Sequence, residues 1–146
     1  MKIMVIYDST FGNTKTIADT IAKELGNDVQ ALSVSDLKEN SLDGIEFLVV
    51  GSPIIAWKPS ERMGMFLSNI PQGRLKGVKA AAFDTRVKLF IHGDAVEKIA
   101  LALTEAGAEM IGESNMFYVK GKEGPLYKGE TEKAIQWAKK LRSIMR

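Results

Sequence analysis

Six consecutive residues near the start of the chain, Ser9-Thr10-Phe11-Gly12-Asn13-Thr14, bring together three hydroxyl groups, one amide and a glycine. They follow a short apolar run and precede a segment with helical periodicity, so they lie where a helix begins. A helix N-terminus offers free backbone N–H groups and a positive dipole end, and glycine lets the backbone approach a ligand closely. The segment therefore predicts a phosphate site built from neutral donors. Helix capping alone is the alternative, although a cap needs only one such residue.

Other common chemistries are excluded by what the sequence lacks. It contains neither GxxxxGK[ST] nor GxGxxG, which argues against a nucleotide-hydrolysing loop and a dinucleotide fingerprint. The third predicted strand is followed by Gly51-Ser52-Pro53, so the aspartate of a phosphoacceptor domain is missing there. With no cysteine and one histidine in 146 residues, we expect no thiol chemistry, no disulfide and no metal site. Redox chemistry would need a borrowed cofactor.

Two further segments carry polar or aromatic side chains after apolar runs. The loop after the third predicted strand contains Trp57, whose ring can stack on a flat ligand or simply cover the helix that follows. The loop after the fourth contains Asp84 and Thr85, which can hydrogen-bond a ligand, and Arg86, which points either to the ligand or to solvent.

Hydrophobic periodicity predicts the elements that must position these loops. The predicted strands are residues 3–7, 29–34, 47–50, 79–83 and 108–111, with 116–119 continuing the last edge. The predicted helices are 13–25, 60–70, 94–106 and 131–145. Ser60 and Asp94 are expected N-caps, and Gly26 and Gly107 follow helices where left-handed caps would lie.

Three expectations concern single side chains. The first helix is predicted to place its apolar side along Thr16, Ile17, Thr20, Ile21 and Leu25. Trp137, in the last helix, is expected in the core. Asp8 ends the first strand and is expected to orient the hydroxyl-rich loop, because a carboxylate beside a phosphate would repel it.

Alternation of strand and helix predicts a three-layer α/β/α domain over residues 1–146, with helices on both faces of a parallel sheet. In such sheets ligands bind beyond the carboxyl ends of the strands, where the strand order reverses. The three polar loops all follow predicted strands. The chemistry is therefore expected at that edge of the sheet.

Residues 9–14 resemble the FMN phosphate-binding loop of the flavodoxin family, and residues 49–57 are similar to the family's loop that wraps the isoalloxazine ring. Length and element order are also similar, in the short form of the family, so the resemblance covers the whole chain. It implies a flavodoxin-like fold with a five-stranded parallel sheet in the order 2-1-3-4-5 and noncovalently bound FMN. The cofactor-binding residues that it implies are Ser9, Thr10, Phe11, Gly12, Asn13, Thr14, Ser52, Pro53, Ile54, Trp57, Phe83, Asp84, Thr85 and Arg86.

The loop after the fourth strand departs from the family pattern, which has acidic groups and a second stacking aromatic there. Here Arg86 and Lys88 are basic, Phe90 is the aromatic available to cover the outer flavin face, and His92 is expected to be structural. Arg86 near the N1–C2=O2 edge would stabilise the reduced flavin by about 1–3 kcal/mol. We therefore expect a less negative hydroquinone potential than in acidic flavodoxins.

The resemblance implies a one-electron carrier between a reductase and an acceptor, with no catalytic side chain of its own. Two alternatives stay open. One is an FMN-dependent NAD(P)H or quinone oxidoreductase with an anionic substrate, and the other is a binding or regulatory protein that holds little flavin.

The net charge of +2 conceals an asymmetry, since residues 1–73 carry a net −3 and residues 74–146 a net +5. Such a dipole can orient an anionic partner, or it can reflect scattered solvated lysines, among them Lys120, Lys122 and Lys128. No motif indicates nucleic acid.

No apolar run is long enough for a signal peptide or a membrane span, so we expect a cytoplasmic protein. The oligomeric state is not predicted.

Overall fold

The computed structural model describes residues 1–88 and 93–145. Its helices are α1 (Asn13–Leu25), α2 (Glu61–Ser68), α3 (Val96–Glu105) and α4 (Glu130–Met145), with one short 3₁₀ turn at Val34–Asp36. Its strands are β1 (Ile3–Tyr7), β2 (Gln30–Ser33), β3 (Phe47–Ile55), β4 (Lys58–Pro59), β5 (Lys79–Val87), β6 (Glu109–Met110) and β7 (Asn115–Val119). Within the described residues, no helix is both long and apolar enough to cross a membrane.

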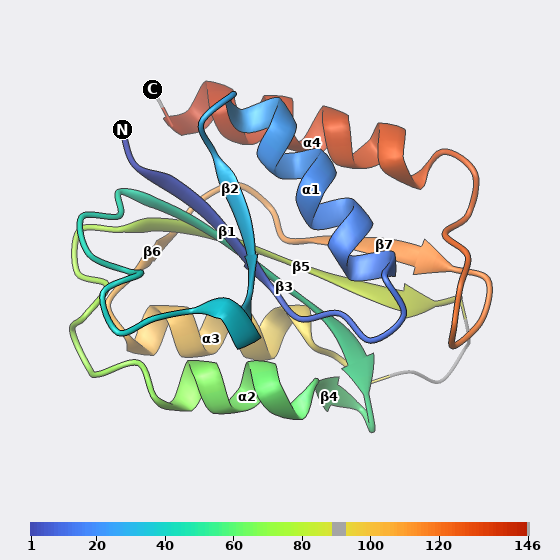
Figure 1. The fold of residues 1–146 in the computed structure, drawn as a ribbon, viewed down its shortest axis with the longest axis horizontal. Helices are drawn as coiled ribbons and strands as arrows, with labels where there is room; N and C mark the ends of the chain where they lie inside the picture. Colours follow the sequence, from blue (N-terminus) through green and yellow to red (C-terminus); the bar gives the residue numbers. More distant parts are fainter. Residues whose placement is uncertain (89–92, 146) are drawn as a thin grey trace.

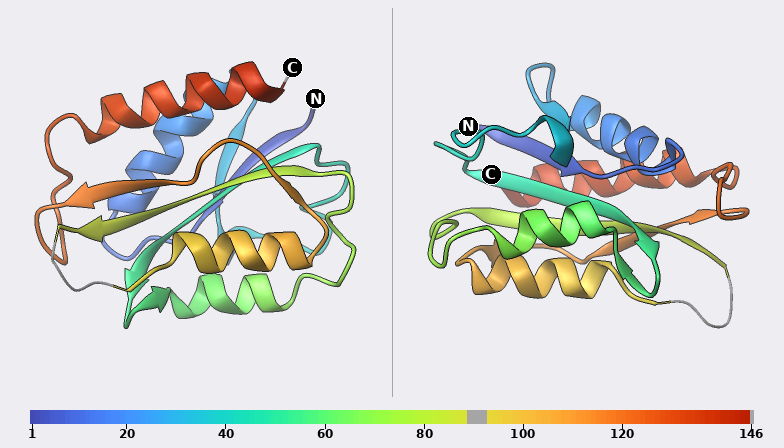
Figure 2. Two further views of the ribbon diagram at one scale, coloured as in Figure 1. Left: turned by 180° about the vertical axis from the view of Figure 1, so that it is seen from behind. Right: turned by 60° about the horizontal axis from the view of Figure 1, so that its bottom comes forward.

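The strands form a parallel sheet in the order β2-β1-β3-β5-β6, which confirms the predicted order of five strands. Helices α1 and α4 cover one face, and α2 and α3 cover the other, so the molecule has three layers (Figures 1 and 2). Two additions change the strand count. The short β4 pairs antiparallel with the end of β3, and β7 pairs parallel with β5 beyond β6.

The predicted fifth strand is split at the sheet edge. Met110 pairs with Ala80, and Asn115 pairs with Phe83. The edge chain therefore advances five residues while β5 advances three. Gly112, at φ 65°, lies in the extra length. The split lets β7 follow β5 to its carboxyl end.

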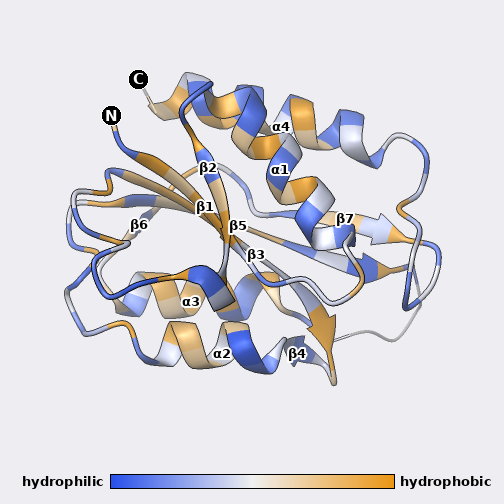
Figure 3. Ribbon diagram, in the orientation of Figure 1, coloured by the Kyte–Doolittle hydropathy of each residue, from blue (hydrophilic) through white to orange (hydrophobic). Residues whose placement is uncertain are grey.

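The core lies in two layers, one on each face of the sheet. In Figure 3 the central strands are mostly hydrophobic, and the helices carry both hydrophobic and hydrophilic residues. On the α1/α4 face, the rings of Phe83, Phe117 and Trp137 meet edge to face, with centroids 5.8–6.1 Å apart. Edge-to-face pairs of this kind add to the hydrophobic gain of burial. The prediction that Trp137 belongs to the core is confirmed.

The two residues predicted to cap helix N-termini, Ser60 and Asp94, both make capping hydrogen bonds. The Ser60 hydroxyl accepts from the Met63 amide at 3.2 Å, and the Asp94 carboxylate accepts from the Glu97 amide at 2.9 Å. Gly107, at φ 107°, ends α3 in the expected left-handed conformation.

Helix α1 has its predicted bounds, but two details of that prediction are wrong. Gly26 is extended (φ 167°), and its amide still donates to the Ala22 carbonyl. The buried side includes Ala18 and Ala22 where the sequence suggested Thr16 and Thr20. Both threonine hydroxyls donate to the carbonyl four residues earlier, which satisfies them on the outer side of the helix.

Candidate functional site

A cavity of about 620 Å³ opens at the carboxyl ends of β1, β3 and β5. This volume is typical of small-molecule sites, which span about 300–1,000 Å³. Ten of the predicted cofactor residues line it: Ser9, Thr10, Phe11, Asn13, Thr14, Pro53, Ile54, Trp57, Thr85 and Arg86. The fold therefore brings the three polar loops together, as expected for the switch point between β1 and β3.

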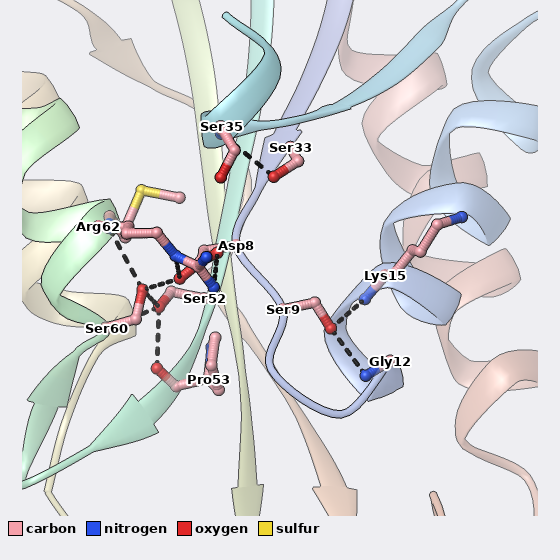
Figure 4. Close-up of polar contacts among 11 residues, drawn as sticks. Asp8, Ser9, Gly12, Lys15, Ser33, Ser35, Ser52, Pro53, Ser60 and Arg62 are labelled. Atoms are coloured by element: carbon pink, nitrogen blue, oxygen red, sulfur yellow. Dashed lines mark hydrogen bonds and ion pairs between the residues drawn. The ribbon is translucent and has the colours of Figure 1, made fainter.

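The hydroxyl-rich loop closes one end of the cavity in front of α1. Ser9 Oγ accepts from the amides of Gly12 (3.1 Å) and Lys15 (3.3 Å), so this side chain shapes the loop and caps the helix (Figure 4). Gly12 does not line the cavity, and its contribution is the turn itself, at φ 94°. Thr14 Oγ1 lies 2.8 Å from Thr85 Oγ1, which joins the loop to the end of β5. This end offers hydroxyl groups and a helix N-terminus to an anion.

Trp57 stands on the opposite rim, in a two-residue turn between β3 and β4. Ala56 and Trp57 both have positive φ, 51° and 71°, as a type I′ hairpin turn requires. Such conformations cost non-glycine residues about 1–2 kcal/mol each, so tertiary contacts must hold them. The Trp57 carbonyl accepts from the Asp94 amide at 3.2 Å and lies 3.4 Å from Lys98 Nζ.

The indole of Trp57 is exposed at the cavity rim, since 57% of the residue is accessible. Gly93 packs against its backbone so closely that a Cβ there would overlap the Trp57 Cα and carbonyl group. The backbone is thus fixed while the ring stays available. The structure therefore does not support the alternative, in which the Trp57 ring packs over the helix that follows, α2.

The structure corrects the expectation for Asp84. Its carboxylate is fully buried and accepts from Arg86 Nε (2.9 Å), Arg86 Nη2 and the Val96 amide (3.1 Å), and it does not line the cavity. Residues two apart on a strand share a face, which places Asp84 and Arg86 side by side. Arg86 is 8% exposed and lines the cavity, so it does not point to solvent. The hydrogen bond to Asp84 raises the pKa of Arg86, which keeps its charge.

Ser52 and Phe83 also lie behind the cavity wall and do not line it. Ser52 Oγ donates to the Pro53 carbonyl (2.8 Å) and accepts from the Ser60 amide (3.0 Å). Phe83 fills the space over Gly51, where no Cβ would fit. Both residues support the loop after β3 from below.

Asp8 does not orient the hydroxyl-rich loop. Its buried carboxylate accepts from Ser60 Oγ (2.5 Å) and Arg62 Nε (3.3 Å), so it joins the end of β1 to the start of α2 (Figure 4). Asp8 Oδ1 lies 3.0 Å from Arg62 Nη2 but is not aligned for a hydrogen bond. The carboxylate thus faces the start of α2 and makes no hydrogen bond to residues 9–14 in the described structure.

Sequence reasoning missed the contribution of the loop between β7 and α4. Asn13 Nδ2 donates to the Glu123 carbonyl at 3.2 Å, and Gly124 lies so close that a Cβ there would force the Asn13 amide to move. This contact holds the loop of Lys122 at the cavity, where the sequence suggested a solvated lysine or a part of the basic face. No local signal could find it, because the two loops lie 110 residues apart. Among the described residues, the cavity is also lined by residues not assigned singly to the cofactor: Ile55, Ala56, Val87, Gly93 and Val119.

Lys122 adds a cation to the cavity lining, and residues 9–14 contain none. Lys122→Ala is expected to weaken binding of FMN about fivefold and to leave riboflavin binding unchanged, because only FMN carries a phosphate and an exposed ion pair contributes up to ~1 kcal/mol. Lys128→Ala, in the same loop but outside the cavity lining, is the control and is expected to change neither affinity. Equal losses for both ligands in a fluorescence titration would contradict a phosphate role.

The expectations for Phe90 and His92 fall outside the described residues.

Comparison with known proteins decides the family. A model of the flavodoxin domain matches residues 4–106, more than half of the chain. The chain belongs to the flavodoxin family. A flavodoxin from the domain Archaea is similar in structure, with a TM-score of 0.80 at 25% identity over 99% of both chains. A search of curated proteins gives no match.

Two bacterial flavodoxins are similar at lower identity and show the fold alone. Flavodoxin 1 of Bacillus cereus has a TM-score of 0.82 at 22% identity over 98% of both chains. The flavodoxin of Streptococcus pneumoniae TIGR4 has 0.79 at 18% identity over 99% of both chains.

This flavodoxin is an FMN-binding electron-transfer protein, and the cavity fits the cofactor. The helix N-terminus and hydroxyls at one end suit the phosphate, and the apolar walls with Trp57 suit the ring. Arg86 offers hydrogen bonds to the polar edge of that ring, and the Thr85 hydroxyl lies beside that of Thr14. Bound FMN supplies one-electron chemistry, and the protein supplies binding and charge.

Proposed function

We propose that this flavodoxin carries single electrons between a reductase and an acceptor protein. The observation that carries the proposal is the cavity itself, which joins a phosphate-binding helix N-terminus to an exposed aromatic rim. A carrier needs a cofactor held firmly at one end and accessible at the other, because electrons must leave through the protein surface. Placement in the cytoplasm stays a prediction.

We assign the cofactor contacts to the cavity-lining residues. The hydroxyls of Ser9, Thr10 and Thr14 bind the phosphate, and Trp57 stacks on the ring. Arg86 faces its pyrimidine side, and the Thr85 hydroxyl supports that of Thr14. The support for this arrangement is that all of them line one cavity.

Two measurements test the proposal. FMN added to the purified protein should give a bound flavin spectrum, and Ser9→Ala and Thr14→Ala should each weaken binding by about 1–2 kcal/mol. Stopped-flow mixing of the FMN-loaded protein with NADPH should leave the flavin oxidised until a reductase is added. Rapid bleaching by NADPH alone would favour the oxidoreductase instead.

The Arg86–Asp84 pair is expected to set the flavin potential. Arg86→Ala removes a cation and leaves the Asp84 carboxylate, so the hydroquinone midpoint should fall by roughly 60 mV, the equivalent of a tenfold change for one electron. Asp84→Asn keeps the cation and removes its counter-charge, so the midpoint should rise. Potentiometric titration of both variants checks the opposite signs. An unchanged or raised midpoint in Arg86→Ala would refute the role of Arg86.

A further inference from the structure

Three lysines and two tyrosines gather at the edge of the sheet beside the cavity, and we call this surface the lysine–tyrosine edge. Lys88 Nζ lies 4.4 Å from the ring centroid of Tyr127 and 5.3 Å from that of Tyr118. Lys120 lies 6.0 Å from the Tyr127 ring, and Lys133 lies 4.7 Å from the Tyr118 ring. Each ammonium is thus within cation–π range of a tyrosine face.

The tertiary structure assembles this edge from separate segments. Val87 pairs with Val119 in parallel register, so Lys88 and Lys120 follow side by side at the strand ends. The chain then returns, with the Lys120 amide donating to the Pro125 carbonyl at 2.8 Å. The Tyr127 amide donates to the Tyr118 carbonyl at 3.0 Å, which sets the two rings at the same edge.

The edge is positively charged, and two of its lysines are exposed. Residues 118–129, which include Lys120 of this edge, contain three lysines and one acidic residue, Glu123, and Lys88 adds a further cation directly after β5. Lys88 and Lys120 are both exposed. Lys133 differs, because Glu130 Oε1 lies 2.9 Å from its ammonium. A cation–π contact orients an ammonium without neutralising it, so less side-chain freedom is lost when a partner binds.

The edge borders the site through which electrons leave. Val87 and Val119, which directly precede Lys88 and Lys120, line the cavity. The tips of β5 and β7 lie at the same end of the molecule as the hydroxyl-rich loop (Figure 1). A protein held by these lysines would therefore lie beside the FMN site.

We infer that the lysine–tyrosine edge is the docking surface for a redox protein with an acidic surface. The inference rests on the proposed carrier function and adds the charge of the partner. Positive charge beside an electron-exit site raises the encounter rate with an anionic partner and disfavours a cationic one. Lysines also protect an exposed edge strand from aggregation. The following experiment distinguishes docking of a partner from that purely structural role.

The test uses two haem proteins of opposite charge as probes: the acidic haem domain of cytochrome b5 and the basic cytochrome c. FMN-loaded protein is reduced with dithionite and mixed with each ferric probe. One electron leaves the flavodoxin and reduces the haem iron to the ferrous state. The rate with the acidic probe is expected to fall roughly tenfold as salt screens the attraction, and the rate with the basic probe is expected to stay level or rise.

Two charge-matched variants locate the effect. Lys88→Gln with Lys120→Gln should slow the acidic probe roughly threefold at low salt. Lys139→Gln with Lys140→Gln removes the same charge late in α4, whose end lies away from the tips of β5 and β7 (Figure 1), and should have little effect. Equal effects of the two variants, or a wild-type rate insensitive to salt, would overturn the docking surface. Absence of a bound flavin spectrum would instead overturn the carrier function.

Discussion

Asp84→Ala is expected to lower the free energy of unfolding by about 3–5 kcal/mol, the loss typical when one partner of a buried ion pair is removed. Asp84 is fully buried, and its carboxylate satisfies both the Arg86 guanidinium and the Val96 amide. Without it, the Asp94 carboxylate still lies near the Arg86 guanidinium, but at 3.8 Å from Nη2. A buried cation and a helix amide both lose an acceptor.

Urea unfolding of the FMN-free protein measures this loss, because bound cofactor would stabilise the folded state by mass action. Asp43→Ala is the control. It breaks an ion pair with Arg74 at 2.6 Å, but that pair is exposed, so the expected change is below ~1 kcal/mol. Similar losses in the two variants would show that burial of Asp84 contributes little.

Gly93→Ala is expected to weaken FMN binding at least tenfold, which corresponds to about 1.4 kcal/mol. The added Cβ would overlap the backbone of Trp57, which cannot yield as a flexible side chain does. Either the turn at Ala56 and Trp57 or the segment that precedes α3 must shift. Both changes disturb the Trp57 carbonyl's hydrogen bond from Asp94 and the placement of the indole.

Gly64→Ala is the matched control for this substitution. Gly64 lies within α2, and a Cβ there would meet no atom within 4 Å. The variant should bind FMN like the wild type and gain about 0.5–1 kcal/mol of stability, because alanine loses less entropy in a helix. Wild-type FMN affinity in Gly93→Ala would show that Trp57 is not held by this contact.

The features that the sequence determined by itself are those whose physical cause is local. Apolar runs placed the strands, and the Ser60 and Asp94 side chains placed two helix starts, because capping and periodicity act over a few residues. The hydroxyl-rich loop was recognisable for the same reason, since its donors are consecutive in the chain.

Strand ends were less predictable. β3 and β5 continue to Ile55 and Val87, beyond the predicted ends at residues 50 and 83, because β4 and β7 supply pairing partners there. Hydrophobic periodicity carries no information about a partner strand that arrives from elsewhere. The same holds for the split at the sheet edge.

Only the tertiary structure decided which polar residues face the cavity. Asp84 has the residue type of a ligand contact, yet Arg86 and the α3 amide occupy its carboxylate. Lys122 has the residue type of a solvated lysine, yet the Asn13–Glu123 contact holds its loop at the cavity. Residue type determines what a side chain can bind, but its partners lie far along the chain, and packing selects among them.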